Sequence, residues 1–113
     1  MAGVSIITIV KDHVNGLMDT HESILKQTHS DWEMLIVVGT SSDSTLATAR
    51  TLESHDHRVK VLEQKGDGIY GAMNEGLQLA RAEFVWFMNA GDKFAAVDIL
   101  EKAVIEMSHR NIG

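Results

Sequence analysis

The chain has 113 residues, the size of one small domain able to bury roughly two-thirds of its unfolded surface. Its 16 acidic and 10 basic side chains give a formal charge of −6, which argues against non-specific binding to nucleic acids or anionic membranes. It has no cysteine, so a disulfide framework and a thiolate metal site are both excluded.

The sequence shows neither a transmembrane segment nor a secretory signal. No apolar run approaches the ~18 residues that a membrane-spanning helix requires. The N-terminal Met-Ala-Gly-Val carries no basic region ahead of the first apolar run, as a signal peptide would. We therefore expect a single domain, residues 1–113, in the cytoplasm.

Four short runs rich in β-branched or aromatic residues predict four strands. They are VSIITIV, EMLIVV, VKVLE and EFVWFMN, at residues 4–10, 33–38, 59–63 and 83–89. The first, second and fourth are almost continuously apolar, which is typical of strands covered on both faces of a parallel sheet. The third alternates between apolar and polar residues, as an edge strand would.

Helical periodicity is found in the segments that follow the strands. Apolar residues recur three or four positions apart in residues 17–25, 46–52, 69–80 and 99–107. Ser and Asp residues, which are common helix N-caps, precede the second of these segments. The alternation of strands and helices predicts an α/β fold, with an open parallel sheet and helices on both faces.

Small, polar or charged residues follow every predicted strand. These strand exits are residues 11–13, 39–43, 64–68 and 89–92. In open parallel sheets, ligands bind beyond the carboxyl ends of the strands. The pattern therefore predicts that the four exits line one ligand crevice, although ordinary loops of α/β proteins have a similar composition.

The third exit contains GDGIYG, residues 66–71, which matches the dinucleotide-binding pattern G-x-G-x-x-G. Asp92 lies downstream at roughly the separation expected of the acid that binds the ribose. However, the match follows the third strand rather than the first, and polar residues precede its first glycine. An NAD-binding Rossmann domain is therefore an alternative that the sequence favours less.

A longer string, GDGIYGAMNEGLQLARAEFVWFMNAGD, resembles the family 2 glycosyltransferases of the GT-A fold. A bacterial group of them reads Gly-Ile-Tyr-Asp-Ala-Met-Asn-x-Gly before a strand that ends in Asn-Ser/Ala-Gly-Asp. Upstream, VSIITIV is similar to their first strand, and GTSSDSTL is similar to their Asp-Gly-Ser-Thr-Asp-Asn-Thr loop. SILKQTHSDWEMLIVV is similar to the segment between these two. The resemblance covers residues 4–94 in order.

The resemblance implies the Rossmann-like, N-terminal half of an enzyme of bacterial polysaccharide biosynthesis. This half binds a nucleoside diphosphate sugar together with Mg²⁺ or Mn²⁺. The full-length enzyme transfers the sugar to an acceptor with inversion. The implied donor-binding residues lie at the strand exits and on the third helix: Thr8, Ile9, Val10, Gly39, Thr40, Ser41, Asp67, Gly68, Asn74, Asn89, Ala90 and Gly91. Asp92 is the implied carboxylate for the metal ion, its structural alternative being a helix N-cap or turn residue.

The sequence also departs from the family. Val38 and Gly39 stand where many members carry acidic residues, one of which holds the nucleobase. Gly71 stands where they carry Asp, and residues 89–91 replace their Asp-x-Asp. The family's catalytic base lies in a second half, so we expect no catalytic residue within these 113 residues.

These departures keep a second class of function open. The chain is alternatively a non-catalytic nucleotide-binding module or an assembly partner. We also expect a homo-oligomer, because the fourth helix would expose an apolar face that a second half covers.

Overall fold

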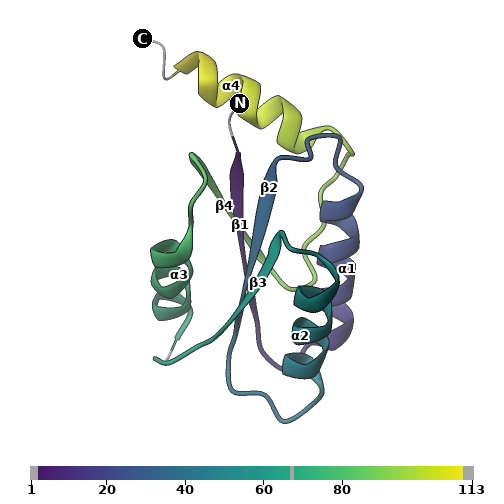
Figure 1. The fold of residues 1–113 in the computed structure, drawn as a ribbon, viewed down its shortest axis with the longest axis vertical. Coiled ribbons are helices and arrows are strands. Elements are labelled where there is room, and N and C mark those ends of the chain that lie inside the picture. The colour runs from purple at the N-terminus through teal and green to yellow at the C-terminus, as the bar shows by residue number, and fades with distance from the viewer. Residues whose placement is uncertain (1–2, 67, 111–113) are drawn as a thin grey trace.

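The computed structural model describes residues 3–66 and 68–110 as an open sheet of four parallel strands with four helices (Figure 1). Within these ranges, no helix has the length and apolar character needed to cross a bilayer. The predicted α/β fold is confirmed, with strand order β3-β2-β1-β4. In chain order the elements are β1 Val4–Val10, α1 Val14–Leu25, β2 Trp32–Val38, α2 Thr45–His55, β3 Val59–Glu63, α3 Gly68–Leu79, β4 Phe84–Asn89 and α4 Ile99–Arg110.

The central strands are β1 and β2. They pair along their whole length, from Val4 opposite Trp32 to Val10 opposite Val38. In each of them all residues but one are buried, which explains their nearly continuous apolar sequences. β3 lies at one edge of the sheet, as its alternating sequence predicts.

β4 lies at the other edge, so the prediction that its apolar run is covered on both faces is wrong. Phe84 and Met88 are buried in the larger core cluster, on the face that also packs against α1. On the opposite face, the side chains of Val85 and Phe87 are 36% and 40% exposed. The reason is that the helix on that face, α3, packs mainly on β1 and β2.

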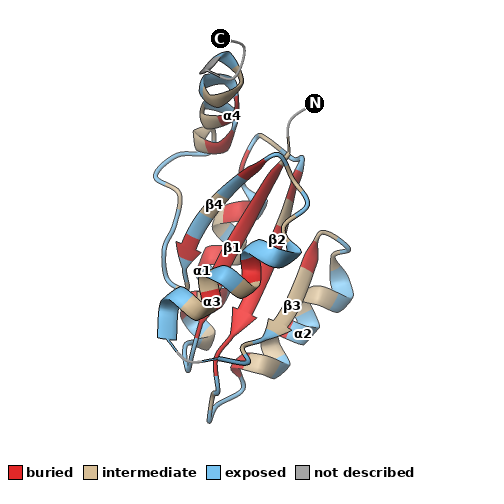
Figure 2. Cartoon of the chain, turned by 90° about the vertical axis from the view of Figure 1, so that its left-hand side faces the viewer, coloured by how far each residue is buried: buried red, intermediate tan, exposed pale blue. Residues whose placement is uncertain are grey.

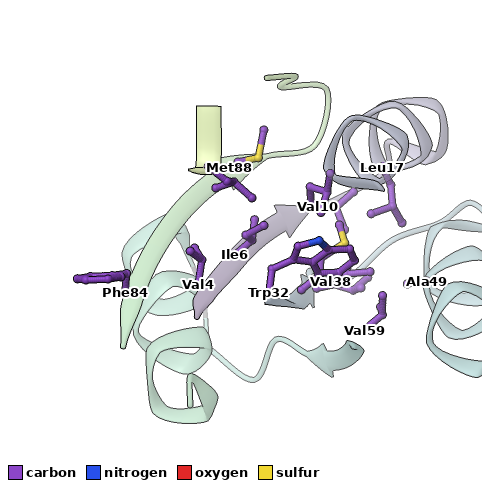
Figure 3. Packing of buried hydrophobic residues seen from close by; sticks show 14 of the residues in the cluster. Val4, Ile6, Val10, Leu17, Trp32, Val38, Ala49, Val59, Phe84 and Met88 are labelled. Carbon is purple, nitrogen blue, oxygen red and sulfur yellow. The ribbon is translucent and has the colours of Figure 1, made fainter. Parts of the chain in front are cut away.

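Helices cover both faces of the sheet, as predicted. α1 and α2 lie on one face, where Leu17 and Ala49 join the larger core cluster (Figures 1 and 3). α3 lies on the other face, where Ala72 packs in a smaller cluster with Ile7. Gly76 permits this close approach of α3, because a Cβ atom there would lie 2.6 Å from the Cγ2 atom of Ile7.

α4 lies at the end of the sheet where the strands begin, opposite the strand exits (Figure 1). Leu100 and Val104 of α4 are buried in the larger core cluster, whereas most of this helix is at least partly exposed (Figure 2). Residues 90–98 lead from the end of β4 back to α4 beside α1. The strand exits therefore occupy an end of the molecule that α4 leaves open.

Candidate functional site

Three of the four strand exits line a common cavity of about 330 Å³ at the carboxyl edge of the sheet. They meet there because parallel strands bring their carboxyl ends to the same edge. Of the predicted donor-binding residues, the cavity brings together Ile9, Val10, Gly39, Thr40 and Gly68. In full, its lining residues are Ile9, Val10, Lys11, Gly39, Thr40, Gln64, Gly66, Gly68 and Ile69.

Hydrogen bonds of Asp12 link the exits of β1 and β2. Its φ of 48° lies in the left-handed region, which Asp tolerates better than most residues. Its N–H donates to the Ser41 hydroxyl at 3.0 Å, and its carboxylate accepts the Ser42 N–H at 2.7 Å. Ser41 in turn donates to the Gly39 carbonyl at 2.9 Å. Ser41 therefore shapes the loop, and it lines a smaller neighbouring cavity of about 200 Å³.

The start of α2 is held to the start of α1 beside this loop. Asp43 accepts the Thr45 N–H at 2.9 Å and also accepts the Thr45 hydroxyl. The Thr45 hydroxyl is the main group that lowers the pKa of the Asp43 carboxyl below its ordinary value. The Thr45 N–H lowers this pKa further, and nearby His13 makes a smaller contribution. The Thr45 hydroxyl also accepts the His13 N–H at 3.1 Å, so the first residues of both helices are linked.

The side chains of Gln64 and Glu75 hold the loop of the third exit. Gln64 Nε2 donates to the Gly68 carbonyl at 2.9 Å. From the second turn of α3, the Glu75 carboxylate accepts the N–H groups of Lys65 at 2.8 Å and Gly66 at 3.2 Å. Gly68 has a φ of 82°, a left-handed conformation that glycine adopts without strain. This part of the cavity is therefore built on main-chain groups whose positions are fixed by two side chains.

Thr8 and Asn74 are predicted donor-binding residues that lie away from the cavity. Thr8 is fully buried in β1 with its backbone between β2 and β4, and its hydroxyl has no partner among the described residues. Asn74 is exposed on α3 and does not line the cavity. Asp67 lies outside the described residues. Thr8 and Asn74 therefore do not line the cavity, which is formed by neighbouring residues at three of the strand exits.

The fourth exit, residues 89–92, does not line this cavity, unlike the predicted crevice shared by all four exits. Asp92 Oδ2 accepts the Asn89 N–H at 2.9 Å, and the Asp92 N–H donates to the Asn89 carbonyl at 2.9 Å. β4 is an edge strand, so the outward N–H of Asn89 has no strand to pair with and takes a carboxylate oxygen instead. Between them Gly91 makes a tight turn with a φ of 102°, and Ala90 donates to the carbonyl of Ile9.

Asp92 instead lines a second cavity of about 330 Å³, along the free edge of β4. Its Oδ1 atom has no hydrogen-bond partner among the described residues, so one carboxylate oxygen remains available. In residues 3–66 and 68–110 there is no group of three His, Cys, Asp or Glu side chains placed to hold a metal ion. The other residues that line this second cavity are Trp86, Phe87, Met88, Lys93, Phe94, Ala95 and Ile99.

The His13 imidazole lies beside both Gly16 and Gly91, which the sequence did not reveal. A Cβ atom on Gly16 would lie 2.3 Å from His13 Nε2, and one on Gly91 would lie 3.3 Å from the same atom. Two glycines far apart in sequence therefore make room for one imidazole. No short sequence pattern indicates that Gly16 and Gly91 lie near the same side chain. Lys11 and Gln64, which line the main cavity, were also not assigned, although each directly follows a strand.

Comparison with known proteins supports a single family. The family model described as "Glycosyl transferase family 2" matches residues 5–111. The "Putative teichuronic acid biosynthesis glycosyltransferase TuaG" of Bacillus subtilis is 34% identical over 109 residues, covering 96% of this chain and 43% of that protein. The Escherichia coli "UDP-Glc:alpha-D-GlcNAc-diphosphoundecaprenol beta-1,3-glucosyltransferase WfgD" is 36% identical over 92 residues, covering 80% of this chain and 35% of that protein.

Solved structures share the fold. The mannosyltransferase PcManGT from Pyrobaculum calidifontis, in complex with GDP-Man and Mn²⁺, superposes with a TM-score of 0.82 at 22% identity, covering 91% of this chain and 31% of that one. S. aureus TarS 1-349 in complex with UDP gives 0.81 at 22% identity, covering 95% and 32%. This chain spans less than half the length of each of these four proteins. Since the family model matches nearly all of its residues, the chain belongs to glycosyl transferase family 2.

Proposed function

We propose that this chain is the donor-binding half of a family 2 glycosyltransferase, which transfers a sugar from a nucleoside diphosphate sugar to an acceptor with inversion. The observation that carries the proposal is the cavity lined by the exits of β1, β2 and β3. It lies where parallel α/β sheets bind their ligands. The printed names of the similar proteins support the substrate class, because they include UDP-Glc, GDP-Man and UDP.

In this proposal the nucleoside lies between the ends of β1 and β2. Val38 is buried at the position where many family members have an acid, so the base lies against Ile9, Val10 and Gly39 without a carboxylate from Val38 or Gly39 to hold it. Lys11 contributes a positive charge near the diphosphate. The proposal therefore combines an apolar, main-chain-lined base site with a cation beside it.

Asp92 is the carboxylate that we assign to a Mg²⁺ or Mn²⁺ ion. Mg²⁺ on a nucleotide is commonly bound by one or two carboxylates, with phosphate and water oxygens as the remaining ligands. Asp92 fits this pattern, because it is an exposed carboxylate and one of its oxygens has no hydrogen-bond partner among the described residues. The His13 imidazole, two residues after Lys11, lies beside Gly91 next to Asp92. When bound, such an ion offsets negative charge on the departing nucleoside diphosphate.

We assign no catalytic base within these 113 residues. An inverting transfer needs a base, usually a carboxylate, to deprotonate the acceptor hydroxyl. In our proposal this group and the acceptor site belong to the portion of the relatives that the chain does not span. The function proposed for this donor-binding half is therefore tested by donor binding rather than by turnover.

The names of the relatives favour a role in bacterial polysaccharide biosynthesis, and we propose a cytoplasmic location for it. They include a teichuronic acid enzyme and an enzyme that acts on a diphosphoundecaprenol-linked sugar. We also propose self-association of the isolated chain. The free edge and exposed apolar residues of β4, together with Ile105 of α4 at 54% exposure, support it.

Calorimetric titration of UDP, GDP and NAD with and without Mn²⁺ tests the proposed function. We expect Mn²⁺ to strengthen the binding of UDP or GDP by about a hundredfold, because Asp92 would hold the ion and the ion would offset the charge of the diphosphate. Mn²⁺ alone should bind weakly, since the described residues offer it no three-ligand group. NAD should bind no better with the ion than without it.

Two other outcomes would contradict this expectation in different ways. Tight, metal-independent binding of NAD would indicate a dinucleotide-binding domain instead. Binding of none of the three nucleotides would favour the non-catalytic assembly module, which the buried Val38 in place of an acid already makes reasonable.

A further inference from the structure

Polar side chains of α1 and of the residues just after it hold the segment that follows β4. Thr20 and Ser23 are three residues apart on one face of α1, and Gln27 follows two residues after the end of this helix. Ser23 Oγ accepts the Phe94 N–H at 2.7 Å, and Gln27 Nε2 donates to the Ala96 carbonyl at 2.7 Å. We call these three residues the α1 polar stripe.

Thr20 is the member of the α1 polar stripe nearest the strand exits, and it holds the turn that carries Asp92. Its hydroxyl accepts the Gly91 N–H at 3.0 Å and donates to the Asp92 carbonyl at 2.7 Å. The hydroxyl thus acts as donor and acceptor to two successive residues of the turn. Thr20 is fully buried, so water does not replace these hydrogen bonds.

The same turn is attached to the start of α1 at a second point. The Gly91 N–H also donates to the Gly16 carbonyl at 3.0 Å, and the His13 imidazole lies against Gly91. The loop that ends at His13 also supplies Lys11 to the main cavity. α1 and its leading loop therefore set the position of Asp92 relative to the cavity.

We propose that Thr20 is a positioning residue for the metal-bound diphosphate, because its hydroxyl fixes the main chain of the turn that carries Asp92, the carboxylate that we assign to the ion. This inference rests on the proposed function. In this proposal Thr20 touches neither nucleotide nor ion and acts only through its hydrogen bonds to the Gly91 N–H and the Asp92 carbonyl. Loss of a hydrogen bond that orients a metal ligand commonly weakens metal affinity by about tenfold or more.

The test compares Thr20→Val with Thr20→Ser in the full chain, using UDP and Mn²⁺ as probes in calorimetry. Thr20→Val keeps the shape of the side chain and removes the hydroxyl, so UDP affinity in Mn²⁺ should fall by about tenfold. Affinity for UDP without metal should stay within about twofold, because Thr20 does not line the cavity. Thr20→Ser retains the hydroxyl and should bind UDP and Mn²⁺ as the parent does. Thr20→Ala provides a second hydroxyl-free variant if Thr20→Val does not fold.

Ser23→Ala is the matched control for a merely structural role. It also removes one hydrogen bond between the α1 polar stripe and the chain after β4, but this bond is to Phe94 rather than to the turn. We expect it to lower the melting temperature while leaving the Mn²⁺-dependent affinity for UDP unchanged.

Two results would overturn the inference while the proposed function stands. One is a parent chain that binds UDP with Mn²⁺ together with a Thr20→Val chain that binds equally well. The other is an equal loss of affinity in Thr20→Val and Ser23→Ala. A parent chain that shows no Mn²⁺-dependent binding of UDP or GDP would overturn the proposed function first, and this inference with it.

Discussion

The Asp92→Ala chain is expected to lose about a hundredfold of its affinity for UDP in Mn²⁺, and to bind UDP about equally with and without the ion. The reason is that Asp92 supplies the carboxylate oxygen for the ion, and the described residues form no alternative three-ligand group. Calorimetry of parent and variant, with UDP titrated at fixed Mn²⁺, measures the difference directly.

Two further variants separate the metal role of Asp92 from its role in the turn. Asp92→Asn removes the charge but keeps an oxygen that can accept the Asn89 N–H, so it should lose Mn²⁺ dependence with little loss of stability. Glu83→Ala makes the same change of net charge at an exposed residue just before β4, at the end of the strand away from Asp92, and should bind UDP normally. Full Mn²⁺ dependence in Asp92→Ala would remove Asp92 from the site.

Gly76→Ala is expected to destabilise the fold by about 1–3 kcal/mol, although alanine is the better helix former. A Cβ atom at this position would lie 2.6 Å from Cγ2 of Ile7, a fully buried side chain on the central strand that has no room to move. The overpacking should therefore outweigh the helical gain. Chemical denaturation with urea measures the change in the free energy of unfolding.

Gly71→Ala on the same helix is the matched control. A Cβ atom there meets no other atom within 4 Å, so only the helical preference of alanine changes. We expect a gain of about 0.5–1 kcal/mol in the free energy of unfolding. Equal effects of the two substitutions would show that α3 does not pack on Ile7 as closely as described.

The strands could be predicted well because each is a short run rich in β-branched or aromatic residues. β1 was predicted at the residues where it is found, and β2 begins one residue earlier than expected, at Trp32. The error concerned β4, whose run from Phe84 resembles that of a central strand. A sequence shows that a strand is apolar, but it does not show whether another strand or helix covers it.

The candidate site was only partly predictable for a similar reason. Glycines in the loops after strands, such as Gly39 and Gly68, can be recognised locally, and both line the cavity. Contacts between distant residues leave no such mark. Only the folded structure shows that Thr20 hydrogen-bonds the turn that carries Asp92. The same is true of the position of His13 beside Gly91.

Mn²⁺-induced line broadening in NMR spectra of the ¹⁵N-labelled chain tests most directly whether the strand exits bind a metal-bound nucleotide. The paramagnetic ion broadens the amide signals nearest to it, with and without UDP. We predict broadening centred on residues 89–93 that appears only when UDP is present, together with shifts of residues 9–11, 39–41 and 68–69. Broadening centred elsewhere, or equally strong without UDP, would contradict the proposed site.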